Sequence, residues 1–275
     1  MKKHGSTILL FLILFIGLSL LLYPTFADWW NSFHQSRAVA SYVEQVSNMD
    51  DTQYDEFWSA AWDYNRSLID RPNDYLLSKE QKEHYAQLLN ITGNGIMGYI
   101  EIPKIDIVYP IYHGTSEAIL QIAIGHLEWT SLPVGGESSH CVVSGHRGLP
   151  SARLFTDLDQ MEVGDTFLLR VLDEVLTYEV DQIKIVEPQV TEDLLIVEGE
   201  DLCTLVTCTP YGINSHRMLV RGHRIETEEV RAVRRVTADA VLLEPTIVAP
   251  CVAAPMLLIL LIVIMIPKPK KRKEN

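Results

Sequence analysis

The sequence lacks the motifs of common metal and redox sites. It has four cysteines among 275 residues, no CxxC pair and no HExxH segment, so no zinc cluster or zinc hydrolase site is indicated. It also shows no internal repeat of roughly 20 to 50 residues, so the chain does not read as a repeat array. We therefore expect neither a metal nor a cofactor.

Basic residues are scarce between the two ends of the chain. The net charge is −13 although both tails are basic, with Lys2 and Lys3 at one end and a cluster over 268–273 at the other. The part between the tails is therefore more acidic than the chain as a whole. Such a surface repels phosphate backbones, and we expect no nucleic-acid partner.

Two long segments have no charged residue, 7–23 and 246–266. Each is long enough to cross about 30 Å of hydrocarbon as a helix. Because their basic flanks face the chain ends, the positive-inside rule places both termini in the cytoplasm and the middle outside. We predict a cytoplasmic tail over 1–6, a transmembrane helix or signal anchor over 7–23, a second transmembrane helix over 246–266 and a basic cytoplasmic tail over 267–275.

The two apolar segments also have other interpretations. The first could be a cleaved signal peptide, with Thr25 and Ala27 as the small residues before the cut, although it exceeds the roughly 7 to 15 residues typical of such a segment. The C-terminal basic cluster could be a nuclear localisation patch, but it directly follows an apolar run. The sequence therefore favours an uncleaved anchor at one end and a stop-transfer anchor at the other.

Between the anchors the pattern changes from helical to β. Residues 32–92 have apolar positions three and four apart, such as Val39, Tyr42 and Val46, which predicts a helical extension interrupted by a loop near Pro72. Residues 93–226 form short alternating segments bounded by turn residues, which predicts an all-β domain of seven or more strands closed into a barrel. A polar linker over 227–245 follows. The expected strands are MGYIEIP, IDIVYPIY, HCVVSG, TFLLRVL, LTYEVDQIKIV, CTLVTC and RMLVRGHRI.

Cys208 ends an apolar strand segment and is followed by Thr209 and Pro210, which stops the strand. The chain then passes through a turn-rich loop into another strand, so an antiparallel return brings Arg217 beside Cys208. A fixed cation favours a thiolate and can hold an oxygen that becomes negative during acyl transfer. The alternative for Cys208 is an inert buried thiol.

Among nine histidines, His146 is best placed to carry a proton for a cysteine nucleophile. It follows the apolar strand 141–143 in a glycine-flanked loop, the kind of strand-end position where barrels place functional groups. The alternative is a turn histidine with no partner. His216 is a second candidate base beside Arg217, but its side chain is expected on the other face of the strand. We interpret Cys141 and Cys203 as core residues.

Three separated segments then carry a family resemblance: TLVTCTPYG around Cys208, SGHRG around His146 and NSHRMLVRG around Arg217. Together with GYIEIP, PIYHGT and GHLE they resemble class C, pilin-polymerising sortases over 93–224. The two flanking spans are also similar to this class. The resemblance implies a sortase barrel of about eight strands in an enzyme of the Gram-positive cell membrane, with its catalytic domain extracellular.

The resemblance implies a cysteine transpeptidase. Cys208 would attack an LPxTG-like sorting signal to form a thioacyl enzyme, and a lysine amine of a pilin subunit would release it. His146 would act as general acid and base, and Arg217 would stabilise the substrate carbonyl and oxyanion. Two alternatives remain open: a housekeeping sortase that attaches proteins to peptidoglycan, and a non-catalytic scaffold for pilus assembly.

One segment departs from the family pattern. Class C sortases usually carry a lid with an Asp-Pro-aromatic sequence, whereas the corresponding loop here places Asp74 directly before Tyr75. We hypothesise a degenerate lid in which Tyr75 covers the cysteine. The alternative is an ordinary polar turn.

Overall fold

The structure is a computed structural model, and it describes residues 5–69 and 76–227. The predicted second span at 246–266, nearly all of the predicted linker at 227–245, and the lid residues Asp74 and Tyr75 lie outside the described residues. The barrel and its flanking helices belong to one compact unit, Phe26–Glu229, and the part of the first helix before Phe26 belongs to another.

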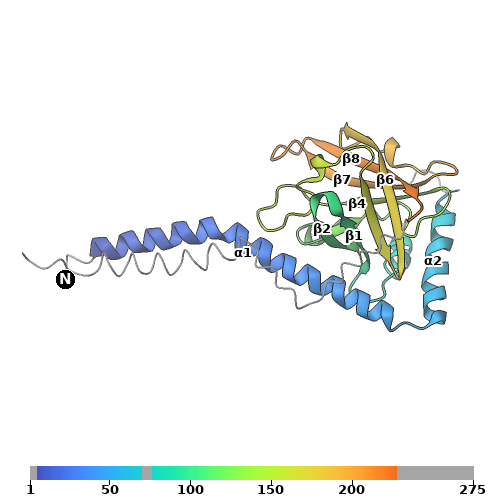
Figure 1. The fold of residues 1–275 in the computed structure, drawn as a ribbon, viewed down its shortest axis with the longest axis horizontal. Helices are drawn as coiled ribbons and strands as arrows, with labels where there is room; N and C mark the ends of the chain where they lie inside the picture. The colour runs from blue at the N-terminus through green and yellow to red at the C-terminus, as the bar shows by residue number, and fades with distance from the viewer. Residues whose placement is uncertain (1–4, 70–75, 228–275) are drawn as a thin grey trace, which may run out of the picture. The chain divides into compact units, whose positions relative to one another are not determined.

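Three helices precede the β-domain: α1 (Gly5–Ser47), α2 (Asp51–Ile69) and α3 (Lys79–Tyr85) (Figure 1). Over residues 5–69 and 76–227, α1 is the one helix long and apolar enough to cross a membrane. α3 begins with a capping box at Ser78, because the Ser78 hydroxyl accepts the Gln81 N–H at 3.2 Å and the Gln81 side chain accepts the Ser78 N–H at 2.7 Å.

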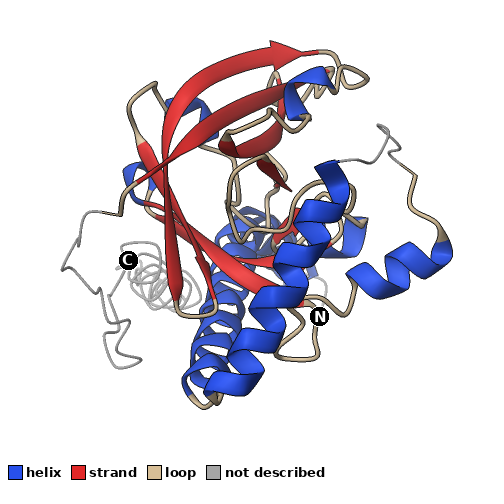
Figure 2. Cartoon of the chain, turned by 90° about the vertical axis from the view of Figure 1, so that its right-hand side faces the viewer, coloured by secondary structure: helices blue, strands red, loops and turns tan. Residues whose placement is uncertain are grey.

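Eight strands form a closed barrel in the order β1-β2-β3-β4-β7-β8-β6-β5, with β5 pairing back to β1 (Figure 2). The predicted closed barrel is therefore confirmed. The strands are β1 (Ile96–Ile102), β2 (Ile107–His113), β3 (Ile124–His126), β4 (Ser139–Ser144), β5 (Thr166–Val171), β6 (Glu174–Val186), β7 (Asp201–Thr209) and β8 (His216–Ile225). Short helical turns connect them: α4 (Glu117–Leu120) and the 3-10 turns η1 (Pro103–Ile105), η2 (Leu158–Gln160) and η3 (Glu192–Leu194).

The segment pattern missed one strand and misplaced the starts of β2, β6 and β7 by two residues each. β3 has three residues, too few to show alternation, and it pairs parallel with β2 and antiparallel with β4. β2 starts at Ile107 rather than at Ile105 as the segment IDIVYPIY suggested, because η1 and a left-handed Asp106 (φ 52°) turn the chain first. The small strand β3 is needed to connect the two halves of the barrel.

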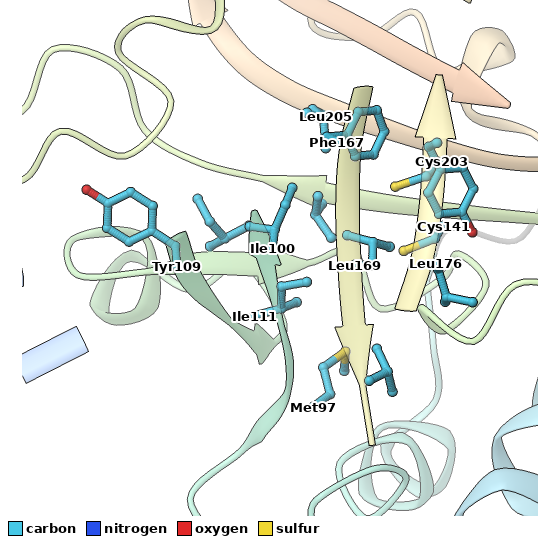
Figure 3. Packing of buried hydrophobic residues seen from close by; sticks show 14 of the residues in the cluster. Met97, Ile100, Tyr109, Ile111, Cys141, Phe167, Leu169, Leu176, Cys203 and Leu205 are labelled. Carbon is cyan, nitrogen blue, oxygen red and sulfur yellow. The ribbon is translucent and has the colours of Figure 1, made fainter. Parts of the chain in front are cut away.

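The barrel interior is filled by apolar side chains from almost every strand (Figure 3). Cys141 of β4 lies opposite Cys203 of β7 in the parallel register, and both thiols are free and buried. The prediction that these two cysteines belong to the core is therefore confirmed. The outer face of β4 is covered as well, by a cluster of Val142, Leu194, Val206 and Leu219.

The helices attach to the barrel through buried polar groups. The Tyr42 side chain of α1 is 0% exposed, donates its hydroxyl hydrogen to Met97 O at 3.2 Å and accepts the Leu172 N–H at 2.8 Å. On α2, Asn65 exchanges two hydrogen bonds with the backbone of Leu132, of 3.1 and 2.7 Å. These contacts fix α1 and α2 against specific loops, whereas apolar packing alone would allow sliding.

Candidate active site

Cys208 occupies the second-last position of β7, between β4 on one side and β8 on the other. Its side chain is half-buried, whereas the preceding residues of the strand, from Leu202 to Thr207, are buried. Among the described cysteines it is the one with access to solvent. Cys208 is therefore not the fully buried thiol of the alternative interpretation, whereas Cys141 and Cys203 are buried.

Arg217 lies directly across from Cys208 in the antiparallel β7–β8 ladder, which confirms the predicted return of the chain. The connecting loop turns through Gly212 (φ 75°) and Asn214 (φ 58°). The guanidinium donates from Nη1 to Asn214 O at 3.2 Å and to His216 O at 3.1 Å. These bonds hold the positive charge at the end of the β7–β8 loop, on the strand that is paired with that of Cys208.

The loop of His146 is tied to the same end of β7. β4 and β7 are paired in parallel up to Ser144 and Val206. The Gly145 N–H then donates to Val206 O at 3.1 Å, and the Thr207 hydroxyl donates to Gly145 O at 2.8 Å. Since His146 is the next residue after Gly145 and Cys208 the next after Thr207, both stand at the end of one ladder.

Gly145 is required by packing. A Cβ at this position would lie 2.6 Å from Ile124 Cδ1 and 2.7 Å from Phe155 Cδ2, closer than real Cβ contacts. The loop also closes on itself, because the Phe155 N–H donates to His146 O at 3.1 Å. The glycine in front of His146 therefore lets the loop lie against the barrel core.

The structure places a carboxylate beside His146 that the sequence analysis missed. Glu117, the first residue of α4, has Oε2 3.6 Å from His146 Nε2. The pKa of the Glu117 carboxyl is lowered, first by a hydrogen bond from the Gln121 side chain and then by the charge of His146. The only signal in the sequence was an acidic residue after a serine, a pattern common to many helix starts. In the structure, the side chain of Ser116 makes no capping hydrogen bond.

The β7–β8 loop adds apolar surface next to the His146 loop. Tyr211 and Ile213 are exposed, and a Cβ on Gly148 (φ 77°) would lie 2.6 Å from the Tyr211 ring. The ring therefore lies directly against the backbone of the Ser144–Gly148 segment.

His216 pairs with Thr209 in the ladder, and its Nδ1 is 2.9 Å from Ser215 Oγ. The two neighbouring positions of β8 alternate between faces, as expected. His126 is fully buried, with Nδ1 2.8 Å from the Tyr85 hydroxyl and Nε2 2.8 Å from Ser131 O. His126 therefore has a structural role at the core.

A closed barrel with a half-exposed strand-end cysteine, an arginine across the ladder and a histidine in the adjoining loop is the arrangement expected of a cysteine acyl-transfer enzyme. Comparison with known proteins agrees. Residues 100–225 match the sortase domain family. Sortase D of Bacillus subtilis is 30% identical over 151 residues, which cover 54% of this chain and 73% of that protein.

Solved structures are similar over more of the chain. The crystal structure of sortase C1 from Streptococcus agalactiae is 49% identical, covers 70% of this chain and 100% of the solved chain, and has a TM-score of 0.68. Sortase C of Streptococcus pneumoniae is 50% identical, with coverages of 69% and 96% and a TM-score of 0.63. The chain belongs to the sortase family, with class C neighbours, and is a cysteine transpeptidase. Sortases are membrane-anchored enzymes of Gram-positive bacteria, and the apolar part of α1 fits such an anchor.

Proposed function

We propose that this sortase joins pilin subunits outside the cell, with Cys208 as nucleophile, His146 as general acid and base, and Arg217 as oxyanion stabiliser. The observation that carries the assignment is the shared end of β4, β7 and β8, where the Cys208–Arg217 pair and the Gly145–Thr207 contact meet. Two similar solved structures support this assignment: sortase C of Streptococcus pneumoniae, studied for its pilin substrate specificity, and sortase C1 of a group B streptococcal pilus island.

In the first step the Cys208 sulfur bonds to the threonine carbonyl carbon of an LPxTG-like sorting signal. The carbon–nitrogen bond to glycine breaks, and His146 gives a proton to the leaving amine. In the second step a pilin lysine amine attacks the thioester and loses a proton to His146, and the Cys208 sulfur leaves. Arg217 stabilises the carbonyl oxygen, which is negative in both tetrahedral intermediates.

The membrane topology belongs to the same proposal. The segment 7–23 and the segment 246–266 both cross the membrane, the barrel lies outside and both termini are cytoplasmic. The basic residues at both ends of the chain support this orientation. A cysteine-labelling reagent that cannot cross membranes should then reach the half-exposed Cys208 in intact cells, and labelling that requires cell lysis would contradict the topology.

The experiment incubates the full chain, in detergent or in discs of lipid bilayer, with a sorting-signal peptide. Intact mass should show a covalent acyl adduct on the wild type and none on Cys208→Ala, with both proteins folded by circular dichroism. A wild-type chain that forms no adduct on any sorting peptide would favour the non-catalytic scaffold and contradict the proposal.

The acceptor is tested on the preformed adduct. A pilin domain with its lysines should release the acyl group as an isopeptide-linked product faster than a peptidoglycan stem peptide does. The reverse order would identify a housekeeping sortase that attaches proteins to peptidoglycan.

The lid remains a separate hypothesis, in which Tyr75 covers Cys208 with Asp74 next to it. If so, Tyr75→Ala should speed labelling of Cys208 by a small thiol reagent, since a covering ring slows access. Unchanged labelling would favour the ordinary turn.

A further inference from the structure

The segment of α1 that follows the apolar run has two different faces. Four aromatic side chains recur at helical spacings of three and four residues, which places them on one face of the helix. This aromatic face consists of Phe26, Trp29, Trp30 and Phe33, and their exposed fractions are 61%, 40%, 50% and 48%. Within the described residues 26–69 and 76–227, no segment covers them to the extent seen in the core.

The opposite face of the same turns is attached to the barrel. Asp28 Oδ1 accepts the Arg153 N–H at 3.1 Å, Asn31 Nδ2 donates to Ser151 O at 2.8 Å, and Gln35 donates to Ile122 O. Ser151 and Arg153 belong to the stretch between His146 and Phe155, whose ends are joined by a backbone hydrogen bond. The helix turns that carry the aromatic face therefore also hold the continuation of the His146 loop.

The aromatic rings form a connected surface. The ring centroids of Phe26 and Trp29 are 5.7 Å apart, those of Trp29 and Phe33 are 6.3 Å apart, and the Arg37 guanidinium lies 5.1 Å from the Phe33 centroid. Monomeric soluble domains rarely leave so many large aromatic residues contiguous and exposed. Tryptophan, by contrast, is enriched at membrane interfaces, where its apolar ring contacts lipid and its N–H contacts water or headgroups.

The position of this face along the chain identifies the occupant. The uncharged segment ends at Tyr23, so Phe26 lies about 4.5 Å and Phe33 about 15 Å further along the helix axis at 1.5 Å per residue. The headgroup layer is about 5 to 8 Å thick on each side, so the four rings share it when residues 26–33 run at a shallow angle to the bilayer surface. The headgroup zones of a bilayer begin where the hydrocarbon ends, and aromatic belts lie there. The four residues of the aromatic face carry no negative charge. This face can therefore contact anionic lipid headgroups without like charges meeting.

We propose that Phe26, Trp29, Trp30 and Phe33 lie in the outer headgroup layer of the bilayer and, through Asp28 and Asn31, hold the His146 loop at a fixed height above the membrane. The claim about the height of the His146 loop rests on the proposed function of His146 as general acid and base. The enzyme then accepts acyl donors whose scissile bond lies close to the membrane more readily than free donors.

The lipid contact is tested with the full chain in bilayer discs whose lipids carry bromine either near the headgroup or near the end of the acyl chains. Headgroup-proximal bromine should quench more tryptophan fluorescence than deep bromine. The double variant Trp29→Phe and Trp30→Phe keeps the rings but removes these indoles, and should lose the quenched fraction. The matched control, Trp58→Phe with Trp62→Phe on α2, should keep it.

Quenching that survives loss of Trp29 and Trp30, or no quenching in discs with a single chain, would overturn the proposal. If quenching is seen in discs with one chain but is lost in discs with two chains, a second copy of the chain covers the aromatic face. This result would also overturn the proposal. Because fluorescence needs no substrate, this result stands even if the proposed function fails.

The preference for donors close to the membrane is tested with a variant in which Phe26, Trp29, Trp30 and Phe33 are all replaced by serine. Cleavage of a soluble sorting peptide should equal that of the wild type, whereas cleavage of the same peptide linked to a lipid in the disc should fall. Equal rates on both donors would contradict this preference. A wild type that cleaves neither donor would contradict the proposed function and leave the quenching result unaffected.

Discussion

At the scale of single residues, Arg217 differs from a lysine in shape more than in charge. Its Nη1 donates to both Asn214 O and His216 O, which fixes the orientation of the guanidinium at the start of β8, the strand paired with that of Cys208. Lysine keeps the charge but loses the fixed planar donors.

We predict that Arg217→Lys lowers kcat/KM for a sorting peptide by about 100-fold, the loss typical of one oxyanion donor. The melting temperature should change little, because the guanidinium is near the surface. Steady-state cleavage with thermal unfolding as control measures both. A variant with wild-type kcat/KM would show that Arg217 does not contact the reacting oxygen.

Glu117 acts at the same scale, through His146. The two side chains are 3.6 Å apart, an ion-pair distance rather than a hydrogen bond, and Glu117 is 72% exposed. An exposed pair of this kind interacts weakly, because water and salt screen its charges.

Glu117→Gln should therefore slow formation of the acyl enzyme only by a small factor, because an exposed ion pair is weak. The difference should disappear in concentrated salt, which a purely structural role would not explain. Glu83→Gln on α3 provides a control of the same chemistry away from the site. A loss that persists unchanged in salt would contradict the electrostatic role of Glu117.

At the scale of elements, the attachment of α1 depends on one buried hydroxyl. Tyr42 bonds both Met97 O and the Leu172 N–H, so the end of α1 is joined to β1 and to the turn after β5. Removal of the oxygen leaves a buried donor and a buried acceptor without partners.

Tyr42→Phe should lower the free energy of unfolding by about 1 to 3 kcal/mol, the penalty for unpaired buried groups. Chemical denaturation of the full chain in detergent measures it. Tyr23→Phe, in the same helix but before the docked turns, is the control and should change little. An unchanged midpoint for Tyr42→Phe would mean that the helix end is not docked as described.

At the scale of the whole molecule, acid stability depends on a buried histidine. His140 of β4 is 1% exposed, with Nδ1 2.7 Å from Leu195 O and Nε2 2.8 Å from Thr204 Oγ1. Burial lowers the pKa of His140 from 6.5 to about 4, and the charge of Arg221 adds to this effect. The folded protein thus holds the neutral ring where the unfolded chain would bind a proton.

A depressed histidine pKa means that the unfolded state binds more protons between pH 6.5 and about 4. Stability therefore falls as pH decreases through this window, by up to about 3 kcal/mol from His140. Denaturant titrations at several pH values should show a shallower decline in His140→Gln than in the wild type. Identical pH slopes for the two proteins would contradict this assignment.

The β-domain and the Cys208–Arg217 pair could be predicted from residues close in the chain. Alternation over short segments predicts strands, and a strand, a proline-containing turn and a second strand fold back locally, so Arg217 had to return near Cys208. β3 was not predicted because three residues are too few to show an alternating pattern. The predicted start of β2 was wrong because the 3-10 turn η1 comes first.

Other features depended on packing between distant segments. His146 comes to Cys208 only because β4 and β7, far apart in sequence, pair in parallel, a register that the whole barrel must specify. Glu117 reaches His146 because α4 contacts β3, and β3 pairs with β4, the strand that leads into the His146 loop. Likewise, the helical period alone predicts that α1 has two faces. Which face docks was set by Asp28, Asn31 and Tyr42, whose buried or backbone-directed polar groups find partners only in the folded barrel.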